Sequence, residues 1–192
     1  MAVDRHFIYN IFADIPMLDT EHLLLRRMKV GDAADMFDYA KRDDVTRYLT
    51  WHSHKTEEYT KQYLQYVQKQ YADGDLYDWA LIDRESGRMI GTCGFTGFDF
   101  DNECGEVGYV IHPDFRGRGL APEAVRRVMQ FGFERLHLHR IKCMYMESNE
   151  ASRRVMEKCG MHYEGTFRQA MRIKDRFCTV VEYAILREEF DA

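Results

Sequence analysis

The residues with the clearest chemical potential lie in the stretch 108–124. An apolar, aromatic run ends at Pro113, and the short loop that follows contains two arginines and two glycines within residues 116–119. Helix-forming sequence begins at Ala121, so the pattern predicts a strand, a phosphate-sized loop and the N-terminus of a helix. The first N–H groups of a helix lack partners and carry the positive end of its dipole, and glycine allows an anion to approach the backbone. This junction therefore predicts an anion-binding site.

Several kinds of loop fit part of this pattern. A P-loop requires Gly-Lys-Ser/Thr where the helix opens, but the chain has Gly119-Leu120-Ala121, which argues against an ATP- or GTP-binding switch. A dinucleotide-binding fingerprint requires a third glycine, and position 122 is Pro122. A tight strand-to-helix turn without a ligand is the remaining alternative, since glycine-rich turns are common.

The loop also resembles a known family signature. The pattern Arg116-x-x-Gly119-x-Ala121, between a strand and a helix, looks like the pyrophosphate-binding signature of the GCN5-related N-acetyltransferases (GNAT). The wider stretch 106–121, together with Asn149-x-x-Ser152 downstream, is similar to the RimJ/RimL-like branch of that superfamily. The resemblance covers about residues 20–190, which is nearly the whole chain.

The resemblance implies acetyl-CoA as the co-substrate. Backbone N–H groups of the loop would hold the diphosphate, and strand residues 109–111 would pair with the pantetheine arm as an added strand. A backbone N–H near Val110 would polarise the thioester carbonyl in an oxyanion-hole role. The asparagine at position 149 would hold the pantetheine amide, cap the next helix, or do both. The cofactor-binding residues expected in this way are Tyr109, Val110, Ile111, Arg116, Gly117, Arg118, Gly119, Leu120, Ala121, Asn149 and Ser152.

The resemblance further implies two catalytic residues, Ser152 and Glu106. Ser152 matches a serine that is thought to protonate the leaving thiolate in RimL-type enzymes, and Met156 replaces the tyrosine that many other relatives use. Glu106 lies at the start of the central strand, where several family members carry a glutamate base that acts directly or through water. An ion pair at the strand edge is the alternative for Glu106. A second glutamate of RimL-type enzymes is replaced here by Met171, which argues against a RimL-like ribosomal-protein specificity.

Composition limits the class of protein. The chain has 192 residues, 45% of them hydrophobic, which is enough for one globular domain. We place this acetyltransferase domain at residues 20–192, after an apolar lead-in segment at 1–19. The lead-in is expected to be loosely ordered and to pack on the domain or on a second subunit, which suggests a possible homodimer. A net charge of −5 argues against nucleic acid as a partner and favours a cationic amine.

The 5 cysteines are scattered without a C-x-x-C pair, which is typical of free thiols in a reducing compartment. The sequence has neither a signal-peptide pattern nor an apolar run of membrane-spanning length, so we expect a cytoplasmic protein without a membrane partner. The pairs His52-x-His54 and His137-x-His139 lack further ligands at a recognisable spacing, so no metal is expected.

Hydrophobic periodicity and turn residues predict interleaved strands and helices, and hence an α+β fold with a mixed sheet. The resemblance adds the details of a GNAT-type sheet, mostly antiparallel, flanked by helices and with splayed central strands. A buried stripe of Ala33, Met36, Phe37 and Ala40 is expected in the first helix of the domain. Strands are expected at about 21–28, 77–83, 89–95, 106–111, 141–147, 163–173 and 179–189, and helices at about 31–40, 56–73, 121–136 and 150–158.

The expected function is transfer of the acetyl group of acetyl-CoA to a primary amine, by direct attack in a ternary complex. The acceptor would be a protein N-terminus or a small amine such as a polyamine. The alternative is a non-catalytic acyl-CoA-binding sensor, against which Ser152 and Glu106 argue. An acidic loop at residues 99–103 is either a solvated turn or an electrostatic guide for an ammonium group.

Overall fold

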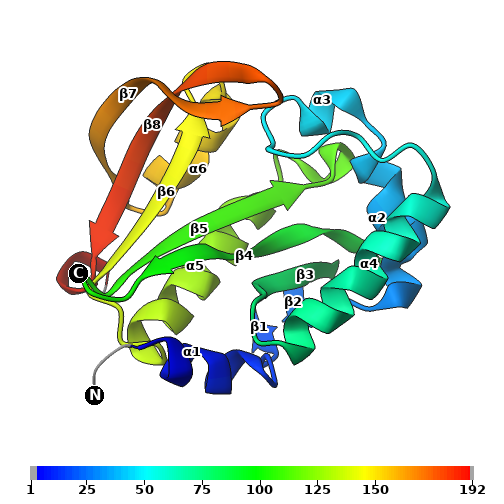
Figure 1. Cartoon of the computed structure of the whole chain (residues 1–192), viewed down its shortest axis with the longest axis horizontal. Coiled ribbons are helices and arrows are strands. Elements are labelled where there is room, and N and C mark those ends of the chain that lie inside the picture. Colours follow the sequence, from blue (N-terminus) through cyan, green and yellow to red (C-terminus); the bar gives the residue numbers. More distant parts are fainter. Residues whose placement is uncertain (1–3, 191–192) are drawn as a thin grey trace.

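One eight-stranded sheet organises the computed structural model, which describes residues 4–190 (Figure 1). The strands lie in the order β1-β2-β3-β4-β5-β6-β8-β7, and every neighbouring pair is antiparallel except β5 and β6, which are parallel. The predicted mixed, mostly antiparallel sheet of an α+β fold is therefore confirmed. The strands are β1 (Leu18–Asp19), β2 (Leu23–Arg26), β3 (Tyr77–Asp83), β4 (Met89–Asp99), β5 (Cys104–Ile111), β6 (Arg140–Met146), β7 (His162–Ile173) and β8 (Arg176–Leu186).

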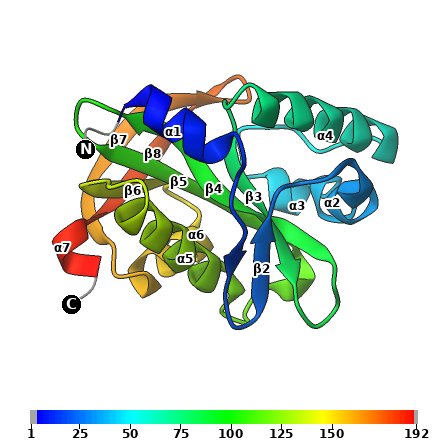
Figure 2. The ribbon, with the colours of Figure 1, turned by 90° about the horizontal axis from the view of Figure 1, so that it is seen from below.

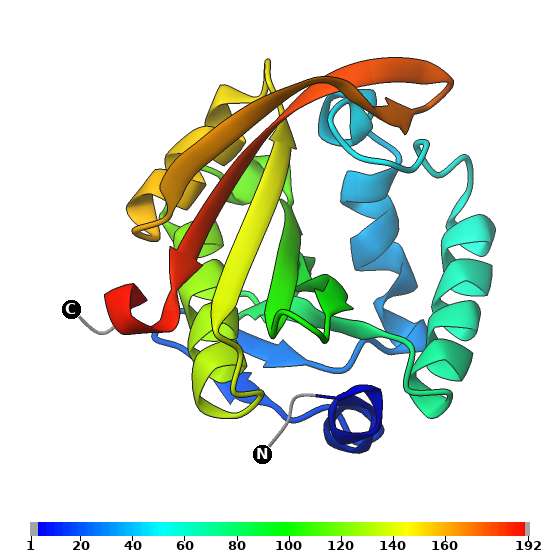
Figure 3. The same ribbon diagram turned by 60° about the vertical axis from the view of Figure 1, so that its left-hand side comes forward.

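Helices cover both faces of this sheet. The apolar side of α5 packs against β4 and β5, and α6 lies beside it, whereas α2 and α4 lie on the opposite face (Figure 3). No helix among residues 4–190 combines the length and the apolar character that crossing a bilayer requires. The helices are α1 (Arg5–Phe12), α2 (Ala33–Ala40), α3 (Asp43–Thr46), α4 (Glu57–Ala72), α5 (Leu120–Glu134), α6 (Glu150–Lys158) and α7 (Arg187–Phe190), with short 3-10 turns at Val30–Asp32 and Pro113–Phe115.

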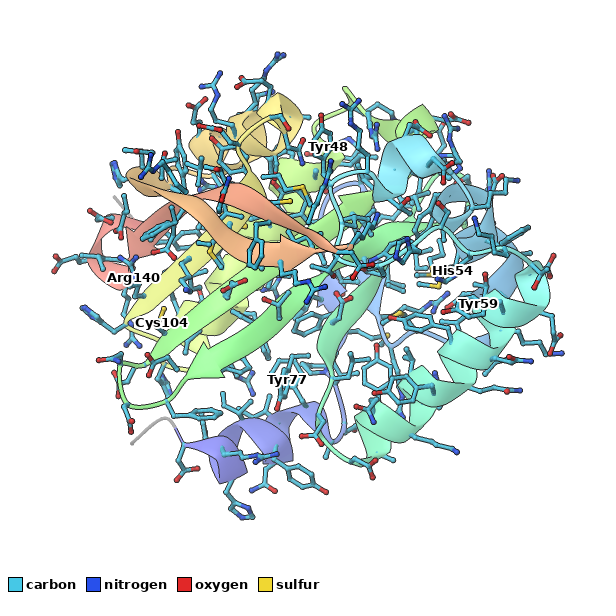
Figure 4. All side chains as sticks on the ribbon, turned by 45° about the horizontal axis from the view of Figure 1, so that its top comes forward. Tyr48, His54, Tyr59, Tyr77, Cys104 and Arg140 are labelled. Atoms are coloured by element: carbon cyan, nitrogen blue, oxygen red, sulfur yellow. The ribbon has the colours of Figure 1, made fainter. Side chains whose placement is uncertain are left out.

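The parallel strands β5 and β6 separate soon after they meet. They pair only where Cys104–Glu106 face Arg140–Lys142, at the end of the sheet where Figure 4 labels Cys104 and Arg140. Beyond this point β5 stays with β4 and β6 stays with β8, so the two strands diverge toward their C-terminal ends (Figure 1). The expected splayed central strands are confirmed, and residues 107–111 of β5 have no strand partner on the β6 side.

The N-terminal segment differs from the prediction of a loosely ordered lead-in. It forms α1, whose residues Ile8 and Phe12, one helical turn apart, are fully buried in the core. The side chain of Asp4 caps this helix by accepting a hydrogen bond from the N–H of Phe7 at 2.7 Å. Viewed from below, α1 lies in front of the sheet (Figure 2), and β1 then pairs with β2. Ile8 and Phe12 thus pack on the domain, which was one of the two expected alternatives for this segment.

Several boundaries also differ from the sequence-based expectation. β4 continues past residue 95 to Asp99 through an irregular register between Phe95 and Gly97, which hydrophobic alternation does not reveal. The acidic loop is therefore a tight turn at the start of β5, at the end remote from the 116–121 loop. In α2, Tyr39 is buried, whereas Phe37 is only partly buried.

We expect Phe12→Ala to destabilise the protein by about 3–5 kcal/mol, because deletion of a buried aromatic ring leaves a cavity. The ring of Phe12 packs against Tyr77, Trp79 and Phe131, with centroids 5.0, 5.3 and 5.9 Å away. Urea unfolding measures this loss, and Asn10→Ala on the exposed side of α1 is the control. A loss below about 1 kcal/mol for Phe12→Ala would show that α1 is not part of the folded core.

Candidate active site

The loop between β5 and α5 carries a row of free backbone N–H groups. Gly117 and Gly119 have φ angles of 80° and 82°, in the left-handed region that favours glycine. Gly119 is the N-cap of α5, and Pro122 in the first turn has no N–H to donate. The N–H groups of residues 117–121 find no acceptor within residues 4–190. Consecutive unpartnered amides at a helix N-terminus form an anion site.

These amides open onto a cleft of about 380 Å³, which lies between the loop, the end of β5 and α6. The cleft contains three cationic side chains, Arg116, Arg154 and Lys158, and none of them forms an ion pair with another described residue. Its carboxylate, Asp44, is already paired with Arg42 at 3.1 Å. The cleft therefore has the charge and the donors that a polyphosphate requires.

Two of these cations, Arg154 and Lys158, were not expected from the sequence. They lie four residues apart on α6, and this spacing places them on the same side of the helix. The signal was present in the sequence, but it becomes specific only once α6 is known to border the cleft.

Arg118 turns away from the cleft. Its Nη2 atom lies 3.1 Å from Oε2 of Glu85 and 3.7 Å from Oδ1 of Asp83, and its guanidinium covers the ring of Phe115. Arg118 was predicted to bind the cofactor. Its guanidinium is already paired, and only its backbone N–H has no partner among residues 4–190. The guanidinium instead ties the loop to the turn between β3 and β4.

A buried histidine holds the start of the loop. Nδ1 of His112 accepts a hydrogen bond from the N–H of Asp114 at 3.1 Å, so the ring proton lies on Nε2, 3.1 Å from Oδ2 of Asp38. Hydrogen bonds from Lys41, Arg88 and His112 hold the pKa of Asp38 well below its usual range. This contact fixes the end of β5 to α2.

The wedge between β5 and β6 exposes backbone groups of alternate residues. The N–H of His112 donates to the carbonyl of Ile90 at 2.6 Å, so every second residue back along β5, including Val110, directs its backbone groups toward β4. Tyr109 and Ile111 therefore direct theirs into the wedge. A thiol contact agrees with this assignment, because Sγ of Cys143 on β6 donates to the carbonyl of Val107 at 2.8 Å.

Ser152 lies beside the side-chain hydroxyl of Tyr109. Oη of Tyr109 is 2.7 Å from Oγ of Ser152 and 3.1 Å from the Ser152 carbonyl oxygen. Burial raises the pKa of Tyr109 well above its ordinary value, so this hydroxyl keeps its proton at neutral pH. Met156 is fully buried in α6, and the tyrosine nearest to Ser152 comes from β5 instead. Sequence reasoning assigned only the backbone of Tyr109 to the site.

Asn149 caps α6 and keeps a free donor. Its Oδ1 atom accepts a hydrogen bond from the N–H of Ser152 at 3.3 Å, while Nδ2 has no acceptor among residues 4–190. The residue lines the cleft as well as the cavity beyond it. The two expected roles of Asn149, helix cap and amide donor, are therefore compatible.

Glu106 lies at the last position where β5 pairs with β6. It forms an ion pair there, which was the alternative to a catalytic role in the sequence analysis. Oγ1 of Thr96 lies 3.2 Å from its Oε1 atom, and Nζ of Lys142 lies 3.5 Å from its Oε2 atom. Lys142 is shared with Glu182 at 3.2 Å. Both carboxylate oxygens of Glu106 thus already have partners, although the residue also lines the second cavity.

That second cavity, of about 460 Å³, lies beyond Ser152. Strands β3, β4 and β5 form its floor, and the β7–β8 hairpin covers it with Met171 and Ile173. The hairpin arches toward α3 (Figure 1), where Lys174 at its tip donates to the carbonyl of Thr46. Figure 4 labels Tyr48, one of the residues at the junction with the cleft. Both spaces are lined by Tyr48, Leu49, Tyr109, Val110, Asn149 and Ser152.

One histidine of each His-x-His pair makes an ordinary contact. Nδ1 of His54 lies 2.8 Å from Oγ1 of Thr60, and the ring of His137 stacks on Phe7. Within residues 4–190, no three His, Cys, Asp or Glu side chains converge as a set of metal ligands.

Comparison with known proteins identifies the family. Residues 22–162 match the family model described as "Acetyltransferase (GNAT) domain". The chain is 33% identical over 156 residues to the "Uncharacterized N-acetyltransferase YoaA" of Bacillus subtilis (strain 168), which covers 81% of this chain and 88% of that protein. It is similar to the crystal structure of a GNAT-family acetyltransferase from Bacillus anthracis, with a TM-score of 0.80, 29% identity and coverage of 91% and 100% of the two chains.

The fold is also shared with RimL, a ribosomal L7/L12 alpha-N-protein acetyltransferase solved in complex with coenzyme A. The TM-score is 0.75 at 19% identity, over 89% of this chain and 98% of that one. The family match covers most of the sequence, and the two structural matches cover 91% and 89% of this chain. The chain therefore belongs to the GNAT family of acetyltransferases.

Proposed function

We propose that this protein transfers the acetyl group of acetyl-CoA to a primary amine. The co-substrate occupies the cleft at residues 117–121, and the amine occupies the cavity under the β7–β8 hairpin. One observation carries the proposal: a row of unpartnered amides borders a cleft that meets a second cavity at Ser152. The diphosphate accepts hydrogen bonds from these amides, and Arg116, Arg154 and Lys158 balance the phosphate charge.

The pantetheine arm lies in the wedge between β5 and β6. It pairs with the backbone groups of Tyr109 and Ile111, and Nδ2 of Asn149 adds one donor. The thioester oxygen accepts from the N–H of Tyr109 or Ile111 rather than from that of Val110, because Val110 directs its backbone toward β4. Both residues adjoin Val110, so this register narrows the expected donor near Val110 to its two neighbours.

In the reaction, the amine nitrogen bonds to the acetyl carbon, the carbon–sulfur bond breaks, and the thiolate takes a proton. Oγ of Ser152 supplies that proton, and the hydroxyl of Tyr109, 2.7 Å from Oγ, extends the proton path and holds Ser152 in position. A thiol has a pKa of about 8.5, so its thiolate needs only a modest acid. Glu106, the other catalytic residue expected from the sequence, has both carboxylate oxygens engaged by Thr96 and Lys142, so we do not assign it a proton transfer.

The acceptor we propose is a protein N-terminus or a polyamine, and the reaction takes place in the cytoplasm. Five free cysteines, four of them buried, support a reducing compartment. Free-thiol release from acetyl-CoA, measured with an alanine-initiated peptide and with spermidine, tests the activity directly. Tight binding of acetyl-CoA without thiol release for either amine would favour a role as an acyl-CoA sensor.

We expect Gly119→Asp to weaken coenzyme A binding by about 100-fold or more, because two like charges about 4 Å apart repel by several kcal/mol near a protein surface. Gly119→Asn is the matched control. Both side chains tolerate the left-handed backbone, and a Cβ at this position meets no atom within 4 Å. We expect the Asn variant to lose less than about tenfold in affinity by calorimetry, because it adds no charge. Equal affinities of the Asp variant and the wild type would contradict a diphosphate at this loop.

We expect Ser152→Ala and Tyr109→Phe each to lower kcat by about 10- to 100-fold, because each removes one hydroxyl of the proton path. The dissociation constant for coenzyme A should change much less than kcat. Tyr163→Phe is the control, since Tyr163 is exposed on β7 and lines neither the cleft nor the cavity. Full turnover in the Ser152 variant would remove this serine from the mechanism.

A further inference from the structure

Asp78 lies on β3 between two cavities. It lines the cavity under the β7–β8 hairpin and also a neighbouring one of about 570 Å³, which α2, α4 and the 51–55 segment enclose. Four residues line both spaces, namely Trp51, Asp78, Thr92 and Val110. Asp78 is the only ionisable residue of these four, so it is the one group at the junction that could bind a cation or exchange a proton.

The carboxylate of Asp78 has a free oxygen. Its Oδ1 atom is buried and has no hydrogen-bond partner in the described part of the chain, and the same is true of Oη of Tyr39, which lines the same neighbouring cavity. Gly94 on β4 leaves room for the carboxylate, because a Cβ at that glycine would lie 2.8 Å from Oδ1. Buried polar atoms in folded proteins are usually paired. Two unpaired oxygens on one cavity therefore point to a ligand that donates hydrogen bonds.

The sheet places Asp78 in register with the strand that lines the proposed thioester site. Asp78 faces Gly94, and Gly94 faces Gly108, so the three residues form one row across β3, β4 and β5. Asp78 thus lies two strand spacings, about 10 Å, from Gly108. The aspartate side chain, a hydrogen bond of about 2.9 Å and an attack distance of about 3.5 Å together span most of this separation. Because Gly94 and Gly108 have no side chains, no side chain of this row stands between Asp78 and β5.

The surroundings of Asp78 suit proton exchange near neutral pH. Burial raises the pKa of Asp78 to about 7, and Thr92 and the backbone lower it only in part. The hydroxyls and the thiol that face Asp78 stay protonated at this pH, because burial raises the pKa of Tyr39, Tyr63, Tyr71 and Cys93. The other titratable groups of the two cavities are Tyr48, His52, His54, Lys55, Tyr59, Asp75, Tyr77, Glu106, Tyr109, Cys143 and Tyr145.

Aromatic side chains complete the neighbouring cavity. Trp51 and Tyr59 flank the ring of His54, with centroids 5.3 and 4.9 Å from it, and Figure 4 shows His54 beside Tyr59. Burial lowers the pKa of His54, which keeps this ring neutral. Aromatic faces are a favourable environment for an ammonium group.

We infer that Asp78 binds the ammonium group of the acceptor and takes its first proton, as the base of the acetyl transfer. This inference rests on the proposed function. Asp78 accepts one proton from the ammonium, and the nitrogen lone pair that this frees forms the bond to the acetyl carbon. The carbon–sulfur bond then breaks, the second nitrogen proton passes to the thiolate through Ser152, and Asp78 releases its proton to solvent. Glu106, in its ion pair with Lys142, is a spectator in this scheme.

The test compares Asp78→Asn, which keeps the size of the side chain, with Glu106→Gln, which removes the competing carboxylate. Thiol release is followed from pH 5 to 9 at saturating acetyl-CoA, with spermidine and an alanine-initiated peptide as acceptors. We expect the wild type and Glu106→Gln to lose activity as the pH falls through about 7. Asp78→Asn should lose about 100-fold in kcat/KM, and its remaining activity should not fall as the pH drops through about 7. Unchanged coenzyme A affinity in calorimetry shows that each variant is folded.

A second measurement keeps this inference separate from the proposed function. The carboxyl carbons of aspartate are labelled with carbon-13, and the signal that Asp78→Asn removes is titrated with and without spermidine. We expect a midpoint near 7 that falls when spermidine is added, because an ammonium partner favours the carboxylate. A midpoint near 4 that spermidine leaves unchanged would overturn the inference even if the enzyme is active. The inference would also be overturned if the activity of Asp78→Asn still fell as the pH dropped through about 7 while that of Glu106→Gln no longer did. Absence of thiol release from the wild type would count against the proposed function alone.

Discussion

The separation of β5 from β6 is the constraint on which the rest of the site depends. Two parallel strands that pair over three residues and then diverge leave main-chain donors and acceptors without a strand partner in the middle of the fold. Such groups are costly to bury unless something else pairs with them. β6 is held by β8 along its full length and β5 by β4, so neither strand can close the wedge. The fold therefore maintains a slot for an extended ligand.

The same divergence brings chemically different groups to one point. β5 ends at the amide-rich loop, and the opening between the strands is where α6 presents Ser152. The cleft on one side and the cavity on the other share the residues around Tyr109. Under the proposed function, an acyl carrier held by its phosphates at the loop would direct its acyl end toward this cavity. The β7–β8 hairpin, fixed to α3 through Lys174, determines how much room that cavity has.

Features encoded by local spacing were predictable from the sequence. The loop, the helix cap at Asn149, the position of Ser152 and most strands follow from neighbouring residues, and so does the α+β class. Features set by tertiary contacts were not predictable in this way. The Tyr109 hydroxyl reaches a residue 43 positions away, and α1 is buried by elements far along the chain. Asp78 is informative only because its Oδ1 atom has no hydrogen-bond partner among residues 4–190, and a sequence cannot display a missing contact.

Amide proton–nitrogen NMR spectra recorded during a titration with coenzyme A test the central claim most directly. If the diphosphate accepts hydrogen bonds from the loop, the N–H signals of Gly117, Gly119 and Ala121 should move downfield together and saturate with the ligand. Signals from the acidic turn at residues 99–103, at the far end of β5, should stay in place. Saturable binding that leaves the loop signals unmoved while other amides shift would contradict the assignment of this loop as the phosphate site.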